Sequence, residues 1–198
     1  ILLIVSFPLN AVFASDIPII VIAPSKKAQS VSTVGTSVTV LDETFFQNSN
    51  ELFLGDALAT NSTSINFFQN GGQGQTSAIQ LRGLPKRYST VYIDGVKMSD
   101  PSTSDNSYYF SNIMNSSIET MEVLRGSQSS IYGSGAIGGT INIYTKNGND
   151  KNVNKINVSS GVDGTQNIDL SFGNYYGNHD YYVGLSRFNT DGISAMND

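Results

Sequence analysis

Apolar and polar residues alternate along the C-terminal part of the chain. The alternation covers residues 155–162, 167–172 and 181–188, and turn residues such as Asp163 and Gly164 separate these segments. A period of two residues predicts strands, and short polar turns between them predict antiparallel hairpins. Alternating segments of about ten residues are typical of transmembrane β-barrel strands. A soluble β-sandwich gives a similar pattern, so both interpretations stay open at this level.

The middle of the chain carries shorter elements of both kinds. Asp42 is suited to cap a first helix, and a second helix is expected at residues 51–60, where several Leu residues can face a core. Residues 37–146 are therefore predicted to form an α+β domain, a small mixed β-sheet with short helices and long loops, large enough for its own core. The strands are expected at residues 37–41, 78–82, 90–93, 119–124 and 140–146.

The N-terminal stretch has a different character. Residues 1–14 contain eleven apolar residues, too few for a membrane-spanning helix, which takes about 20. They match the apolar core of a signal peptide, with residues 12–14 as a cleavage site; a buried element of the fold is the alternative. Because neither Met nor a basic segment precedes them, we expect the sequence to begin inside the signal.

Residues 15–36 are expected to be a short strand followed by a linker. The extended-preferring residues 19–23 lie between Pro18 and Pro24. Proline cannot donate to a β-ladder, so these residues can pair only over a short length. Residues 25–36 are polar and irregular, which favours a linker.

Composition narrows the class of protein. The chain has 11 Lys and Arg, 16 Asp and Glu, and a formal net charge of −5. Its charged fraction is 14%, against about 25% in soluble domains, and 27 Ser and 20 Asn take the place of charges. The acidic balance argues against nucleic-acid binding. The absence of Cys excludes disulfides and thiolate chemistry, and the N-terminal stretch favours a periplasmic, secreted or outer-membrane location.

No residue pattern predicts catalysis. Residues 133–138 (GSGAIG) fit G-x-G-x-x-G, but a dinucleotide site needs a strand before the motif and a helix after it. Here a strand is predicted after the motif, so we expect a chain reversal instead. The aspartates between residues 94 and 105 match no calcium loop, and Glu119 and Glu122 are expected to be solvated on opposite faces of one strand. We expect no enzyme, no cofactor and no metal site.

Two loops have a composition suited to a neutral polar ligand. Residues 64–81 and 99–117 contain neither Lys nor Arg, but they are rich in amides, hydroxyls and aromatic rings. Such groups hydrogen-bond and stack against polar molecules and are poorly suited to a strongly anionic one. Solvated loops without a ligand are the alternative.

Four segments resemble a known family. They are NGGQGQTSAIQLRG (70–83), TVYIDGVKM (90–98), IETMEVLRG (118–126) and SSIYGSGAIGGTINIYTK (129–146). Their order and spacing resemble the N-terminal plug domain of the TonB-dependent outer-membrane receptors. The resemblance implies a transporter in the outer membrane of a Gram-negative bacterium, with the plug inside a large barrel. Residues 147–198 are then expected to be the first barrel strands, in contact with membrane lipid.

The segment DIPIIVIAP (16–24) is similar to the TonB box of that family. In such receptors the box is released to the periplasm and adds as an edge strand to the partner protein TonB. The pull of TonB, driven by the inner-membrane proton gradient, then opens a path past the plug. The resemblance assigns TonB binding to Ile19, Ile20, Val21, Ile22 and Ala23.

Within the family, the run QNGGQGQTSAIQLRG (69–83) is most similar to the cobalamin receptors. In those receptors the plug loop before the LRG strand touches the ligand, and a later loop is a second candidate. Siderophore receptors share much of the plug pattern, so a ferric siderophore or another nutrient is the alternative ligand. The cation-free loops favour cobalamin. The resemblance assigns ligand binding to Gln69, Gln75, Thr76, Ser102, Thr103, Ser104, Asp105 and Asn106.

Arg82 and Arg125 match family positions at which plug arginines pair with barrel glutamates. A buried guanidinium needs such a partner. Residues 147–198 contain no Glu, so the partners are expected in a part of the barrel beyond these residues. Ordinary surface arginines are the alternative.

The number of residues after the plug bears on what kind of molecule this is. At about ten residues per strand, residues 147–198 suffice for three or four crossings, whereas the smallest barrels need about eight strands. We therefore expect the chain to be part of a larger receptor. A secreted β-rich binding or adhesion module, which needs neither TonB box nor barrel, is the rival class.

Overall fold

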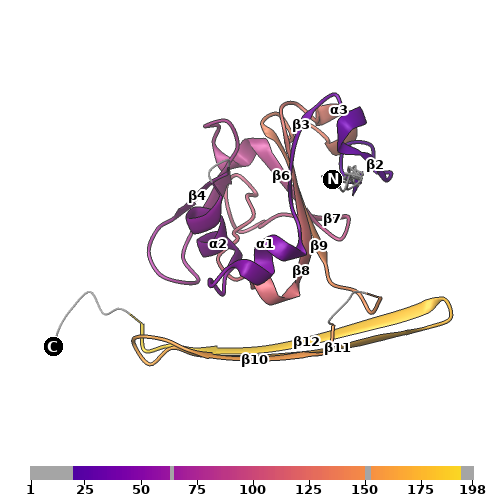
Figure 1. The fold of residues 1–198 in the computed structure, drawn as a ribbon. Helices are drawn as coiled ribbons and strands as arrows, with labels where there is room; N and C mark the ends of the chain where they lie inside the picture. The colour runs from indigo at the N-terminus through magenta and orange to yellow at the C-terminus, as the bar shows by residue number, and fades with distance from the viewer. Residues whose placement is uncertain (1–19, 63–64, 150–152, 193–198) are drawn as a thin grey trace, which may run out of the picture.

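A computed structural model describes residues 20–62, 65–149 and 153–192. A domain built on a five-stranded sheet lies over a separate sheet of three long strands (Figure 1). The predicted signal segment, residues 1–14, and Ile19 of the predicted TonB box lie outside the described residues.

The central sheet is mixed, as the sequence predicts. Strands β6 and β9 run parallel, and every other neighbouring pair in the sheet is antiparallel. Strand β7 was not predicted; it forms a hairpin with β6 through Asp94 and Gly95, both at positive φ. In spatial order the strands are β3 (Ser37–Leu41), β8 (Ile118–Arg125), β9 (Gly139–Thr145), β6 (Ser89–Ile93) and β7 (Val96–Met98).

Both faces of the sheet are covered at its centre. One face carries Met121, Val123, Ile141 and Ile143, which belong to the buried apolar core. Because successive residues of a strand point to opposite faces, Glu122 and its register partner Asn142 lie on the other face, and both are buried. The strands β8 and β9 therefore pack on two sides, although their sequences alternate between polar and apolar residues.

Phe46 of the first helix and Leu54 and Leu58 of the second belong to the apolar core, whereas the last short helix lies beside the N-terminal strands. In α1 (Glu43–Asn48) the predicted cap is confirmed, since Asp42 accepts a hydrogen bond from the Phe45 N–H at 3.0 Å. The helix expected at residues 51–60 is α2 (Leu54–Asn61), which buries Leu54 and Leu58. The remaining helices are short: η1 (Val31–Thr33), η2 (Lys86–Tyr88), η3 (Asn115–Ser117) and α3 (Ser129–Tyr132). Among the described residues, no helix is long and apolar enough to cross a membrane.

Two small antiparallel sheets complete the domain. The hairpin of β4 (Asn66–Gln69) and β5 (Ser77–Gln80) carries the first candidate ligand loop between its strands. At the N-terminus, β1 (Ile20–Val21) pairs with β2 (Gln29–Ser30). The expectation of an irregular linker over residues 25–36 is thus wrong for β2 and η1, because Gln29 and Ser30 supply the pairing partners of Val21 and Ile20.

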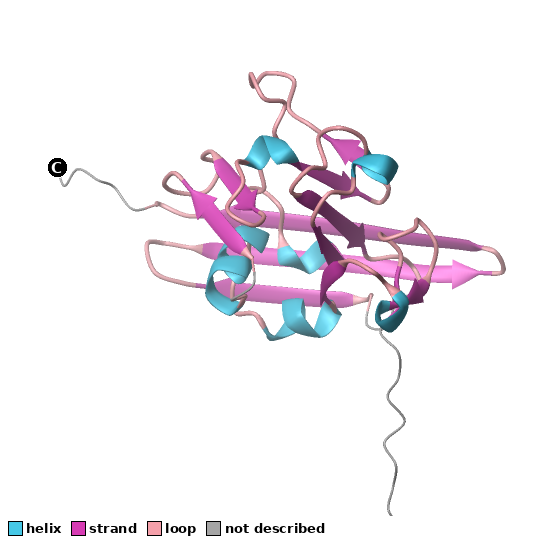
Figure 2. Ribbon diagram, turned by 90° about the horizontal axis from the view of Figure 1, so that it is seen from above, coloured by secondary structure: helices cyan, strands magenta, loops and turns pink. Residues whose placement is uncertain are grey.

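The alternating C-terminal segments form β10 (Lys155–Ser160), β11 (Gln166–Tyr176) and β12 (His179–Asn189) in one antiparallel sheet (Figure 2). One face is apolar and largely exposed, with Phe172 opposite Val183 and the half-buried Leu170 opposite the exposed Leu185. The other face is polar and turned toward the domain: Asp169 is buried and accepts a hydrogen bond from the Ser116 hydroxyl at 3.4 Å. An apolar outer face over a polar inner face is the pattern of barrel strands, and the sheet is open.

Candidate functional site

The main chain after β1 rests on a buried carboxylate. The Ile22 N–H donates to both oxygens of Glu122, at 2.9 and 3.1 Å, and the Ala23 N–H donates to Oε2 at 2.7 Å. Glu122 is only 2% exposed, and burial raises the pKa of its carboxyl against the opposing effect of these hydrogen bonds. The expectation of a solvated Glu122 is wrong, because residues 21–23 cover its face of the sheet.

Tyr132 of α3 holds the same segment from a second side. Its hydroxyl donates a hydrogen bond to the Ala23 carbonyl oxygen, and the Lys26 ammonium lies 5.3 Å from the centre of its ring. Burial, and then the nearby Glu122 carboxylate, raise the pKa of Tyr132 to about 12. Ala23 is therefore bound at both its N–H and its carbonyl.

The described residues of the predicted TonB box thus have defined places. Ile20 pairs with Ser30 through the main chain. The side chains of Val21 and Ala23 are buried, whereas that of Ile22 is 41% exposed. None of these residues joins the five-stranded sheet of the plug.

The first candidate ligand loop, residues 70–76, is organised by its own hydrogen bonds. The Gln69 amide donates to the carbonyls of Gly71 and Gly72 at 3.0 and 2.9 Å, so it shapes the loop. Gln75 and Thr76 are exposed. Gln73, which the sequence did not single out, donates to Asp56 of α2 at 2.7 Å, while burial raises the pKa of Asp56.

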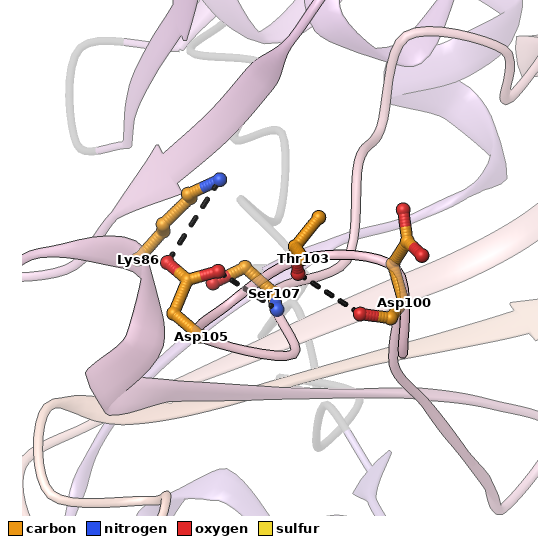
Figure 3. Close-up of polar contacts among 5 residues, drawn as sticks. All are labelled: Lys86, Asp100, Thr103, Asp105 and Ser107. Atoms are coloured by element: carbon orange, nitrogen blue, oxygen red, sulfur yellow. Dashed lines mark hydrogen bonds and ion pairs between the residues drawn. The ribbon is translucent and has the colours of Figure 1, made fainter.

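The second candidate loop is built around two aspartates (Figure 3). Asp100 accepts hydrogen bonds from the N–H and the hydroxyl of Ser102, and the Thr103 hydroxyl donates to the Asp100 carbonyl at 2.9 Å. Asp105 accepts from the Ser107 N–H at 3.3 Å. The side chain and then the N–H of Ser102 lower the pKa of Asp100, and the side chain and then the N–H of Ser107 lower the pKa of Asp105. Ser104 and Asn106 are exposed at the loop surface.

A cation lies beside this loop, although the loop sequence contains none. The Lys86 ammonium of η2 is 3.9 Å from Asp105 Oδ2 and 4.3 Å from the centre of the Tyr109 ring. The composition of the loop did not indicate this cation, because Lys86 precedes the loop by more than ten residues. The two candidate loops are also connected, since the Phe110 N–H donates to the Ser77 hydroxyl at 2.8 Å.

Arg82 and Arg125 lie close together. Burial and then the charge of Arg82 lower the pKa of Arg125, and a Cβ atom at Gly126, the residue after Arg125, would be 3.5 Å from Arg82 Nη1. Arg125 also donates to the Thr39 hydroxyl. Two like charges side by side favour the approach of an anionic group.

A hollow of about 670 Å³ separates the plug from the three-stranded sheet. Glu51, Asn115 and Lys146 line it from the plug, and Asp169 and Tyr182 line it from the strands. None of the predicted ligand-binding residues faces it. The predicted ligand-binding residues and this hollow are therefore separate, although Asn115, near the end of the 99–117 loop, lines the hollow.

The fold and these segments define a class of protein. The family model described as the TonB-dependent Receptor Plug Domain matches residues 30–140, and the chain belongs to this family of outer-membrane receptors of Gram-negative bacteria. It is 34% identical over 127 residues to the vitamin B12 transporter BtuB of Photobacterium profundum, a match that covers 64% of this chain and 21% of that protein. BtuB of Vibrio vulnificus is 33% identical over 144 residues, 73% of this chain and 23% of that protein. The chain thus spans between a fifth and a quarter of the length of these relatives.

Solved structures share the fold at lower sequence identity. The siderophore receptor PiuA from Acinetobacter baumannii superposes with a TM-score of 0.62 at 24% identity, over 81% of this chain and 22% of that one. The alcaligin outer-membrane receptor FauA from Bordetella pertussis gives 0.65 at 15% identity, over 87% and 29% of the two chains. These likenesses cover both the plug and the strands that follow it.

Proposed function

We propose that the chain is the N-terminal part of an active transporter, and not of an enzyme, that carries a small-molecule nutrient across the outer membrane with energy from TonB. The observation that carries the proposal is the state of residues 20–23, which pair over two residues with β2 and stay outside the plug sheet. Since this segment is held by two ladder positions and by side chains of Glu122 and Tyr132, its detachment would leave the five-stranded sheet intact.

The detached segment would be the TonB-binding strand. Once Ile20 to Ala23 leave, their N–H and carbonyl groups are free to add to the edge of a partner sheet. Pro18 and Pro24 limit that strand to the residues between them. The assignment extends to Ile19, which precedes the described residues.

We infer that cobalamin is the ligand. The relatives named as vitamin B12 transporters support it, as does the polar surface of the two loops, where Gln75, Thr76, Ser104 and Asn106 are exposed. Ser102 and Thr103 shape the second loop through Asp100, and Gln69 shapes the first. A ferric siderophore is the second candidate, because Lys86 gives the loop a cation; its pairing with Asp105 leaves little net charge for an anion.

The two arginines would fasten the plug. Because Arg82 and Arg125 are neighbours on one side of the plug, carboxylates of the barrel wall would bind both. The apolar outer face of β10, β11 and β12 would contact lipid, which a secreted adhesion module does not require.

The ligand proposal is tested by equilibrium binding to the full-length receptor. Cyanocobalamin and ferric chelates of the catecholate and hydroxamate types are titrated separately. We expect saturable binding of cyanocobalamin that a Gln75→Ala, Thr76→Ala double variant weakens, and no effect of Ser25→Ala in the N-terminal hairpin. Binding of a ferric chelate alone would replace cobalamin with a siderophore.

A further inference from the structure

We propose that Glu122 and Tyr132 form a docking site for the main chain of residues 22–23, and that this site competes with any partner that pairs with the N-terminal segment. The docking itself is independent of what that partner is. The competition rests on the proposed function, in which the partner is TonB.

The first half of the site is the carboxylate of Glu122. Two consecutive N–H groups, those of Ile22 and Ala23, point toward the same side and meet its two oxygens. Successive main-chain N–H groups arranged in this way make a concave site for an anion, and hydrogen bonds to an ionised acceptor are stronger than neutral ones. The segment leaves the β1–β2 ladder after Val21, and this departure turns the two N–H groups toward Glu122.

The second half of the site is Tyr132, which binds the Ala23 carbonyl, a group that the Glu122 carboxylate cannot bind. A carboxylate only accepts hydrogen bonds, whereas the Tyr132 hydroxyl donates to the Ala23 carbonyl. The N-terminal hairpin accordingly lies beside α3 (Figure 1). The pair recognises one residue from both of its peptide groups, and the side chain of Ala23, 1% exposed, leaves no room for a large substituent.

The position of Glu122 on the sheet makes the contact exclusive. Glu122 stands on the face opposite the apolar core, between register partners Val40 of β3 and Asn142 of β9. Its hydrogen bonds occupy the N–H groups of both Ile22 and Ala23, and strand addition to another protein would need one of the two, because successive N–H groups of a strand point to opposite edges. The docked and the partner-bound states of this segment therefore exclude each other.

Cysteine accessibility in the full-length receptor tests the docking. The 198 residues contain no Cys, so Val21→Cys places a thiol at a fully buried position and Ile22→Cys places one at an exposed position. We expect maleimide to label the Val21→Cys receptor slowly. Adding Glu122→Gln should accelerate that labelling at least about tenfold, because one amide oxygen replaces two and an NH₂ donor now faces the N–H groups.

Three controls keep the result specific. Glu119→Gln removes the same charge from the same strand and should leave labelling at position 21 unchanged, and the Ile22→Cys receptor should react fast in every background. Tyr132→Phe removes a single hydroxyl and should accelerate labelling by a smaller factor. If Glu122→Gln does not fold, the labelling rate of Tyr132→Phe tests the docking site instead. Equal protection of the position-21 thiol with Glu122, with Glu122→Gln and with Tyr132→Phe overturns the docking site. Equal acceleration by Glu119→Gln and Glu122→Gln overturns it too.

A second measurement addresses the partner. The affinity of the receptor without an introduced cysteine for the periplasmic domain of TonB should rise in Glu122→Gln and not in Glu119→Gln. If the position-21 thiol becomes accessible while TonB binds the parent and Glu122→Gln equally or not at all, the docking stands, and the competition with TonB is overturned.

Discussion

The ammonium of Lys86 lies 3.9 Å from the Asp105 carboxylate and so forms an ion pair beside the second ligand loop. Breaking this pair should change which ligand the loop prefers. Asp105→Asn leaves Lys86 uncompensated, so we expect affinity for an anionic ferric chelate to rise by up to about fivefold, the scale of a partly exposed pair. Cyanocobalamin affinity should stay level or fall. Titration of both ligands checks this, and a Lys86→Met, Asp105→Asn double variant should cancel the gain.

The pairing of β1 makes Ile20 a sensitive position for transport. Proline there removes a main-chain donor from the strand that TonB would bind. Ile20→Pro should abolish ligand uptake in cells and leave ligand binding to the purified receptor unchanged. Ile20→Val, which keeps the N–H, is the matched control. Normal growth of the proline variant on limiting ligand would contradict the assignment of the TonB box.

The neighbouring arginines predict a loss of plug retention. Arg125→Ala removes one of two cations that would bind barrel carboxylates, and a buried anion left without its partner is strongly unfavourable. We expect faster proteolysis of the plug and greater permeability of cells to bulky antibiotics. Arg187→Ala, opposite Ile168 on the outer face of the three-stranded sheet, should change neither. Unchanged retention and transport in Arg125→Ala would remove the fastening role.

Gly139 should be the least replaceable glycine of the central sheet. It has φ +148, and a Cβ atom there would come within 2.1 Å of the Leu124 carbonyl oxygen on the neighbouring strand. Gly139→Ala should lower the free energy of unfolding by at least about 1–3 kcal/mol, the scale of such backbone strain. Gly35→Ala, where nothing lies within 4 Å, should be nearly neutral. Denaturant unfolding followed by tyrosine fluorescence or proteolysis compares them.

The buried Glu122 gives the plug a defined pH dependence. Burial raises its pKa above 4.5, the value for the unfolded chain. Between the two pKa values the folded state binds more protons than the unfolded state, so stability falls as pH rises from about 4.5 through the folded pKa. Asp56 has the same sign. Glu122→Gln should therefore flatten part of this slope, whereas Glu119→Gln should preserve it. Unfolding midpoints from about pH 4 to pH 8 make the comparison.

Local chemistry made part of this structure predictable. Asp42 caps a helix by binding the N–H of Phe45, three residues later. The alternation of β11 and β12 places apolar and polar residues on opposite faces whatever the rest of the chain does. The antiparallel C-terminal strands followed from patterns of this kind, whereas the plug was predicted from the resemblance of four segments to a known family. The predicted ligand and barrel contacts are still predictions.

Features that depend on distant residues escaped the sequence. Glu122 looked solvated because the residues that bury it lie 99 and 100 positions earlier. Lys86 was not associated with the ligand loop because the pairing with Asp105 is tertiary. The short strands β4 and β7 depend on hairpin partners, and their own sequences carry too few residues for a clear period. For Glu122 and Lys86 the deciding contact is tertiary and no local pattern encodes it, whereas the Asp94-Gly95 turn is a local signal for the β6–β7 hairpin.

The order of strands in the central sheet also governs when the plug can assemble. Strands β3 and β6 are not neighbours, because β8 and β9 lie between them. Strand β3 pairs with β8 and β6 pairs with β9, and these two central strands come last in the domain. A chain that emerges N-terminus first has no sheet centre until residues 118–145 are available. Folding must then close long loops at once, which makes it slow and late. The same arrangement leaves the residues before β8 without their sheet, and so able to pass through a narrow export channel, until the domain is complete.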